Sequence, residues 1–140
     1  MKSVITILIC AMALLGCESN PPRTSANASP EEVTFLKLPD SVTEIQYWDD
    51  GHSKIARFKI TESEFISLFS TKSFTEIDHP IKYEIDVFGD PSKPPRGVPN
   101  HGAATAEIGL IYQLIEKNGG GETILYDRHA GVGFYDYAPW

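Results

Sequence analysis

Short runs of alternating polar and apolar residues constrain the fold of this chain more than any other feature. They lie at residues 44–48 and 82–87 and, less regularly, at 54–60, and two further strands are predicted at 122–126 and 132–137 on either side of a turn. Alternation with a period of two places apolar side chains on one face of a β-strand, where they can pack against a core. In the run at 54–60, Ala56, Phe58 and Ile60 are therefore expected to face the core.

Turn-forming residues separate these runs. Asp49-Asp50-Gly51-His52 is typical of a hairpin turn, because Asp-Gly tolerates positive φ angles. Pro39 bars a helix from continuing through it, and the apolar run before it, at 33–38, fits either a strand or a helical turn. Residues 89–102 contain four prolines and three glycines, and a loop of this length indicates a functional segment or disorder. A polyproline recognition segment at 91–99 is one such function.

One amphipathic helix is predicted after residue 60. Thr61-Glu62-Ser63-Glu64 has the spacing of a capping box, in which the first and last residues satisfy each other's backbone amides. Phe65, Leu68 and Phe69 follow at helical spacing. We expect a helix at about 62–71 whose apolar stripe packs on a sheet.

Residues 106–117 fit two structures. The helical alternative has an apolar stripe of Ile108, Ile111, Tyr112 and Ile115. The strand alternative places on one face Ile108, Leu110, Tyr112 and Leu114. The β-branched and aromatic content, Gly109 inside the run and the glycines at 119–121 after it favour a strand that enters a hairpin.

These elements predict an α+β fold. We expect a single domain at 33–140, an antiparallel β-meander with one short helix packed on the sheet. The net charge of −7 argues against a nucleic-acid partner, whose phosphates require a basic face, and permits a basic protein partner. Both cysteines, Cys10 and Cys17, precede the domain, which therefore has no disulfide.

The first 17 residues have the pattern of an export signal. Met1-Lys2-Ser3 carries a positive charge, and the uncharged run Val4 to Leu15 follows it. This run is shorter than the roughly 20 residues that a permanent transmembrane helix needs. Residues 18–32 are rich in Pro, Ser, Asn and charges and contain no large apolar residue, so we expect a flexible tether there.

Leu14-Leu15-Gly16-Cys17 resembles the lipobox of bacterial lipoproteins. The resemblance implies that residues 1–16 are a signal peptide and that the Cys17 sulfur carries a diacylglycerol. The new amino group can then also take an acyl chain such as palmitate. It implies a cell-envelope protein anchored by lipid, and Glu18 favours the outer membrane, facing the periplasm, if the host has two membranes.

A looser resemblance extends over most of the remaining chain. Residues 38–47, residues 57–65, Tyr126-Asp127 and the aromatic last strand look like small uncharacterised bacterial lipoproteins. This resemblance implies no activity.

Four aromatic residues are candidates for binding a partner. They are Trp48, Tyr135, Tyr137 and Trp140. Tyrosine and tryptophan are common anchors at protein interfaces, and alternation places some of these side chains on a second sheet face. Packing between strands explains aromatic residues in these runs equally well.

Candidates for chemistry are weak. His52, His79, His101 and His129 all fall in predicted turns or loops, and no two have metal-ligand spacing. Asp127-Arg128-His129 brings an acid near a base, but a polar turn between strands is normally solvated. No phosphate-binding, nucleophile-elbow or calcium-loop motif is present, so we expect no catalytic residue, metal or cofactor.

The sequence therefore favours a membrane-anchored lipoprotein with a non-enzymatic envelope or partner-binding role. A small acidic inhibitor or immunity protein that acts on a secreted or periplasmic enzyme is the alternative, since the acidic charge would favour a basic target. A hydrolase that uses loop His and Asp residues is a third hypothesis.

Overall fold

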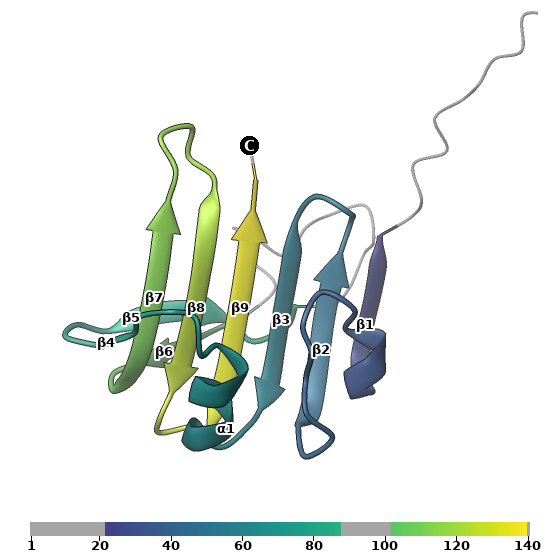
Figure 1. Ribbon diagram of the computed structural model, residues 1–140, viewed down its shortest axis with the longest axis horizontal. Helices are drawn as coiled ribbons and strands as arrows, with labels where there is room; N and C mark the ends of the chain where they lie inside the picture. Colours follow the sequence, from purple (N-terminus) through teal and green to yellow (C-terminus); the bar gives the residue numbers. More distant parts are fainter. Residues whose placement is uncertain (1–21, 88–101, 140) are drawn as a thin grey trace, which may run out of the picture.

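The computed structural model describes residues 22–87 and 102–139, which form a single domain made mostly of antiparallel strands (Figure 1). The main sheet has seven strands. In spatial order they are β1 (Arg23–Ala28), β2 (Thr43–Asp49), β3 (Lys54–Lys59), β9 (Val132–Ala138), β8 (Gly121–Asp127), β7 (Gly109–Ile115) and β4 (Thr75–Glu76). A second sheet contains β5 (Ile81–Glu84) and β6 (Ala103–Ala106). The helical elements are the α-helix α1 (Glu62–Leu68) and the 3-10 helix η1 (Pro30–Glu32).

The strand order differs from one simple meander. Strands β1 to β3 form one meander and β7 to β9 form another, and the pairing of β3 with β9 joins them in the middle of the sheet. The prediction of antiparallel strands with one helix is thus confirmed, but the last strand adds beside β3 rather than at an edge. The helix and the second sheet come from the chain between the two meanders and cover the sheet, while β4 from the same stretch adds a short strand at its edge.

Strand predictions hold for four of the predicted strand runs and for the ambiguous segment 106–117. The runs at 44–48, 54–60, 122–126 and 132–137 are β2, β3, β8 and β9. The ambiguous segment contains β7, so the strand alternative is right. Gly109 explains part of this choice. Its φ of +147° favours glycine, and a Cβ there would lie 1.8 Å from the carbonyl oxygen of Tyr126 on the paired strand.

Helix α1 confirms the predicted capping box. The backbone amide of Glu64 donates to Thr61 Oγ1 at 3.3 Å, and the Glu64 carboxylate accepts from the Thr61 amide at 3.4 Å. The helix ends at Leu68, three residues earlier than predicted, and Phe69 is its C-cap. Phe65 is fully buried, which confirms that this helix packs on the sheet through its aromatic stripe.

Both faces of the main sheet are covered, and each has its own core. On the helix side, α1 and the chain from Val33 to Val42 pack against a cluster that includes Ala56, Phe58 and Ile60, as predicted. On the other side, β5 and β6 pack against a cluster that includes Ile55, Leu125 and Phe134. The local sequence patterns did not reveal this second core, because β5 and β6 are far from β3 in sequence.

The tether prediction for residues 18–32 is corrected in its described part. Residues Arg23–Ala28 form β1, which pairs antiparallel with β2, and η1 follows. Polar residues suit an edge strand because its outer groups face water, so a lack of apolar residues did not exclude pairing. The segment 33–38 forms neither a strand nor a helix but a turn, with the amide of Leu36 donating to the carbonyl of Val33 at 3.1 Å.

The predicted strand at 82–87 is only partly right. Strand β5 ends at Glu84 and pairs with β6. One buried hydrogen bond ties this small sheet to the large one: the Tyr83 hydroxyl donates to Asp127 Oδ2 at 2.9 Å. Burial and then this bond to Asp127 raise the pKa of the Tyr83 phenol, which therefore stays protonated as a donor. The Pro-rich segment 89–102 lies outside the described residues except for Gly102.

Candidate functional site: a groove beside an open strand edge

Strand β7 has an outer edge that is only partly paired. On that edge β4 pairs with Ile111 and Leu110, and in the described part of the chain no strand pairs with residues 112–115. An unpaired strand edge presents main-chain donors and acceptors to an incoming strand. The open part of β7 is therefore a potential docking edge.

The direction of the backbone groups follows from the ladder. The carbonyl of Ile108 accepts from the amide of Arg128 at 3.0 Å, and the amide of Glu116 donates to the carbonyl of Gly120 at 2.8 Å. The main-chain groups of even-numbered residues in β7 therefore point toward β8. On the opposite edge, the amide of Ile77 donates to Gly109 at 2.9 Å. The main-chain groups of odd-numbered residues thus point to the outer edge. In the part of β7 that β4 does not pair with, these residues are Gln113 and Ile115. Their amide and carbonyl groups are aimed away from the sheet.

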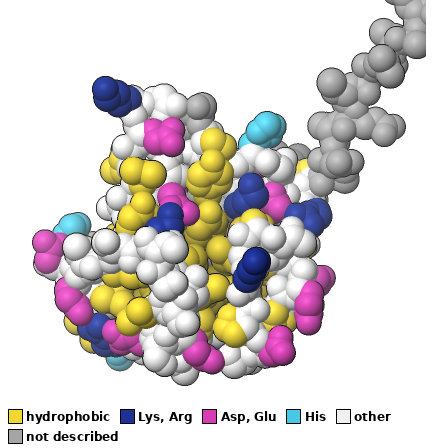
Figure 2. Space-filling view, viewed as in Figure 1, with side chains coloured by type: hydrophobic (Ala, Val, Ile, Leu, Met, Phe, Trp, Pro, Cys, Tyr) yellow, Lys and Arg dark blue, Asp and Glu magenta, His cyan; other side chains and the backbone are white. Residues whose placement is uncertain are grey.

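Apolar side chains surround this edge. Ile115 is 77% exposed and Leu114 is 49% exposed, on opposite faces of β7. Figure 2 shows hydrophobic side chains reaching the surface toward the upper end of the sheet, where the β7–β8 hairpin lies in Figure 1. Exposed large apolar residues that cluster at an edge strand are typical of interaction sites.

A groove of about 630 Å³ lies next to the edge. Its walls come from the β7–β8 hairpin, the β2–β3 turn and the end of β9. Gln113, Thr123 and Asp136 are consecutive cross-strand partners and share the face that β5 and β6 cover further along. The groove is thus the part of that face beyond the second core.

The ionisable side chains that line the groove are all acidic. They belong to Asp50, Glu122 and Asp136. Asp136 shares the face of the groove with Gln113 and Thr123, whereas the Glu122 carboxylate lies on the other face of β8 and pairs with Lys72. Asp50 accepts hydrogen bonds from the amides of His52 and Ser53 within its own turn. The groove therefore has an apolar rim and an acidic lining, which favours a ligand with cationic and apolar groups.

The predicted partner-binding residues lie elsewhere. Trp48 is 2% exposed and Tyr135 is 8% exposed, and we correct the prediction that these two rings are available to a partner. They are buried because both sheet faces are covered. Tyr137 is half-buried, with Lys54 Nζ 5.5 Å from its ring centroid. Trp140 and Cys17 lie outside the described residues.

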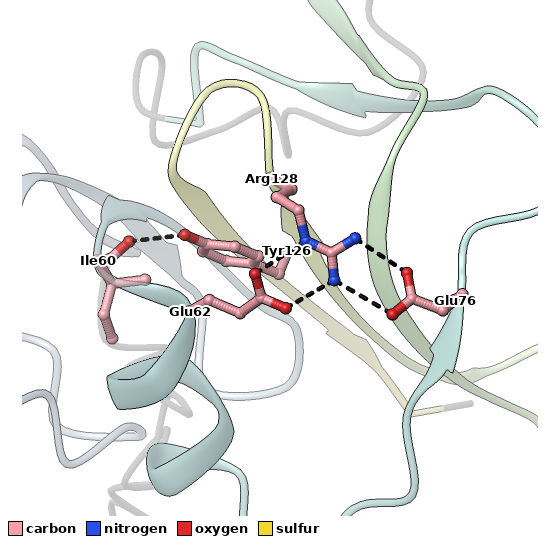
Figure 3. A network of polar contacts seen from close by, with 5 residues as sticks. All are labelled: Ile60, Glu62, Glu76, Tyr126 and Arg128. Atoms are coloured by element: carbon pink, nitrogen blue, oxygen red, sulfur yellow. Dashed lines mark hydrogen bonds and ion pairs between the residues drawn. The ribbon is translucent and has the colours of Figure 1, made fainter.

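The turn Asp127-Arg128-His129 has a structural role. Asp127 is buried rather than solvated as predicted, and it accepts from the amides of His129 and Ala130 at 3.0 and 3.1 Å. Arg128 bridges Glu62 at the start of α1 and Glu76 of β4, as Figure 3 shows. Beside it, the Tyr126 hydroxyl donates to the Ile60 carbonyl at 3.2 Å. The side chains of Asp127 and Arg128 thus connect this turn to neighbouring elements of the fold.

The described histidines do not converge. His52 lies in the β2–β3 turn, His129 lies in the β8–β9 turn at the other end of the sheet, and His79 contacts the adjacent Asp78. His101 lies outside the described residues. Within residues 22–87 and 102–139, no group of three or more His, Cys, Asp or Glu side chains could hold a metal ion. Over the same ranges, no helix has the length and apolar character needed to cross a bilayer.

Comparison with protein-family models, with curated proteins and with solved structures gave no match. The groove must therefore be interpreted from its own geometry. Sequence reasoning assigned residues 106–117 to a strand but did not identify its edge as a site. The available signal was the run Tyr112-Gln113-Leu114-Ile115, which would leave apolar residues exposed if β7 had no outer neighbour.

Proposed function

We propose that this chain is a lipid-anchored cell-envelope protein that binds an extended, cationic and apolar segment of a partner protein along β7. The observation that carries the docking part is the edge at Gln113 and Ile115, which has no partner strand in the described ranges and lies beside an acidic groove. An extended segment can add to such an edge through main-chain hydrogen bonds, while side-chain pockets provide specificity. The anchoring part is supported by the lipobox-like sequence at Cys17.

The position of the edge relative to the anchor supports this combination. Arg23, Asp49, Lys54, Tyr137, Glu122 and Leu114 are successive cross-strand partners in one row. The start of β1 is thus at the same end of the sheet as the groove. Six residue steps separate Cys17 from Arg23, so a lipid on Cys17 would hold this end within about 20 Å of the membrane. The partner would then be met close to the membrane surface.

The acidic charge of the groove favours a basic segment as the one that binds along β7. A segment that alternates basic and apolar residues would place one set toward the acidic groove and the other against Leu114 or the opposite face. A second copy of this chain would bring another acidic groove to the same end, and like charges oppose such pairing. We therefore favour a basic partner over self-association.

Anchoring is tested with Cys17→Ser in the full chain. The substituted protein should be released from membranes or remain unprocessed, because oxygen cannot replace the sulfur that takes the lipid. Membrane fractionation and the mass of the mature chain measure both outcomes. Unchanged mass and membrane partition would contradict lipid anchoring.

Docking is tested with a synthetic peptide of alternating Lys and Val and a control peptide of alternating Glu and Val. We expect the full chain to bind the first peptide, more weakly at high salt, and not the second. Gln113→Pro should abolish binding, because proline removes the outward amide and leaves the β8 ladder intact. Gln113→Ala, which keeps the amide, is the matched control.

Two results would contradict the docking proposal. One is equal binding of the Lys–Val peptide to parent and Gln113→Pro when both are folded. The other is a dimer in sedimentation analysis that becomes a monomer on Gln113→Pro, since a second copy would then be the occupant.

An inhibitor or immunity role would use the same surface. The acidic lining of the groove is the observation that favours it, because a basic enzyme would be attracted to it. Incubation with envelope nucleases and hydrolases distinguishes the two roles: loss of enzyme activity that depends on Gln113 supports inhibition, and binding without loss supports a scaffold.

A further inference from the structure

The unpaired part of the β7 edge is short and is closed at one end. Strand β4 runs antiparallel along this edge and begins at Thr75, opposite Ile111 (Figure 1). The outward-pointing residues that remain in β7 are Gln113 and Ile115. A strand added beside them would lie in line with β4. Its nearer end would therefore meet the chain that leads into Thr75.

Phe74, the residue before β4, closes this end. Its neighbour Thr75 pairs with Ile111, so Phe74 takes the place opposite Tyr112. The Phe74 ring lies 6.5 Å from the Tyr112 ring and 5.2 Å from the Phe65 ring of α1, as measured between centroids. Two chains cannot occupy one place in the sheet. The last residue that an added strand can pair with β7 is therefore the one opposite Gln113.

This closed end favours the terminus of a chain over an internal segment. An internal segment would have to leave the sheet by a sharp turn opposite Gln113. On one face it would meet Phe74, which packs on the core under α1, and on the other face the second sheet covers the side of Ile111. A chain that ends opposite Gln113 needs no turn.

The groups at the closed end favour a carboxylate over an ammonium. Lys72 is the only ionisable residue between Phe69 and Thr75, and its Nζ lies 4.7 Å from the centroid of the Tyr112 ring. It pairs with Glu122, whose side chain is only 15% exposed. Cations and main-chain N–H groups recognise a terminal carboxylate, whereas a terminal ammonium would be repelled by Lys72. An antiparallel strand brings its carboxyl end to this place, because it runs in the same direction as β4.

We infer that the β7 edge binds the carboxyl terminus of its partner, in a segment whose last three residues are basic, apolar and basic. The inference rests on the proposed function, because it specifies the occupant of the same edge. Directly opposed side chains lie on one face of a sheet. The last residue, opposite Gln113, and the third from the end, opposite Ile115, thus face the side of the acidic groove. The residue between them lies on the face of Leu114.

Two octapeptides of equal composition test whether the closed end fixes the register. Both alternate Val and Lys and have a free carboxyl group, and one ends in Lys while the other ends in Val. We expect the full chain to bind the peptide that ends in Lys several-fold more tightly. A fixed end sets the register, and a shift by one residue moves every side chain to the other face. A peptide that slides along the edge would show no such preference.

Extensions of the peptide that ends in Lys test the direction of binding. A Gly-Ser extension at the carboxyl end should weaken binding by about tenfold or more, because it removes the terminal carboxylate and adds residues where Phe74 lies. The same extension at the amino end should leave the affinity unchanged, since that end points away from β4. Amidation of the carboxyl group removes only the charge, and it should weaken binding less than the carboxyl-terminal extension does.

Substitutions in the full chain locate the carboxylate. Lys72→Gln should reduce the preference for the free carboxyl group over the amide. Lys117→Gln removes an exposed cation from the β7–β8 turn, at the other end of the unpaired edge, and should leave that preference unchanged. The peptide comparisons use the unaltered chain, so they decide the inference even if Lys72→Gln fails to fold.

Three results would overturn the inference while docking along β7 stands. They are equal affinity for the two octapeptides, equal tolerance of both extensions, and weaker binding caused by the amino-terminal extension alone. In each case Gln113→Pro would still abolish binding. Binding of none of the peptides to the folded parent chain would contradict the proposed function itself, and the inference with it.

Discussion

Arg23 Nη2 lies 2.6 Å from Asp49 Oδ2, and this ion pair fixes the first strand to the sheet. Asp49 is 5% exposed, and its other carboxylate oxygen accepts from the amide of Gly51 at 2.8 Å. One carboxylate thus joins β1 to β2 and shapes the turn that leads to β3. Strand β1 is consequently part of the domain.

We predict that Arg23→Ala destabilises the protein at pH 7. Asp49 would keep one hydrogen bond but lose its cationic partner while it stays buried, which costs about 1–3 kcal/mol in the free energy of unfolding. Urea denaturation measures this. Lys37→Ala removes an exposed cation as a control and should change the free energy by less than about 0.5 kcal/mol. Equal effects of the two changes would contradict the assignment.

Deletion of residues 18–29 is expected to lower the thermal midpoint by several degrees. The deletion removes β1 and exposes the edge of β2, including the pairing of Ser25 with Tyr47. Lost edge pairing is the physical cause, since β1 contributes little apolar burial. Calorimetry of the deleted and parent chains measures the thermal midpoint. An unchanged midpoint would support the earlier prediction that this segment is a flexible tether.

The cap and the core contact of α1 should differ in cost. Thr61→Ala removes one exposed capping bond and should cost about 0.5–2 kcal/mol. Phe65→Ala leaves a cavity among the rings of Phe69, Phe74 and Tyr126 and should cost about 3–5 kcal/mol. Urea titration ranks them. A milder effect of Phe65→Ala would mean that the helix does not pack as described.

Tyr83→Phe should cost about 1–3 kcal/mol, because the buried carboxylate of Asp127 loses a hydrogen-bond donor. The ring itself, which packs against Phe134, remains. Tyr112→Phe is the matched control, since the Tyr112 hydroxyl has no hydrogen bond within the described residues. Chemical denaturation of both variants measures the difference, and similar values would exclude a special role for the Tyr83 bond.

Arg128→Gln should lower the thermal midpoint at pH 7, and by less in acid. The hydrogen bonds from Arg128 hold the pKa of Glu62 below its ordinary value of 4.5. A carboxyl whose pKa is depressed on folding contributes stability above its unfolded pKa, and this contribution is lost as the pH falls through the folded pKa. Thermal melts at pH 7 and pH 3 test the sign. A larger difference at pH 3 would contradict it.

Local patterns of the sequence determined much of the fold. Alternation identified β2 and, less regularly, β3, because a strand that packs one face on a core alternates polar and apolar residues, and the turn at 127–131 separated β8 from β9. The Thr61–Glu64 spacing determined where α1 begins, since the capping bonds join residues three apart. Gly109 and the hairpin glycines indicated that 106–117 is a strand. The lipobox-like residues around Cys17 stay a sequence prediction, outside the described residues.

Tertiary structure decided what depends on residues far apart in the chain. Trp48 and Tyr135 are buried because covers from distant segments pack on both sheet faces, and no local pattern shows that. Arg23 became part of a strand because Asp49, 26 residues later, offers a buried partner. Among the described residues, no strand pairs with the edge at Gln113 and Ile115, because β4 begins at Thr75, opposite Ile111. Strand pairing between such distant segments is set by the assembled sheet rather than by either sequence alone.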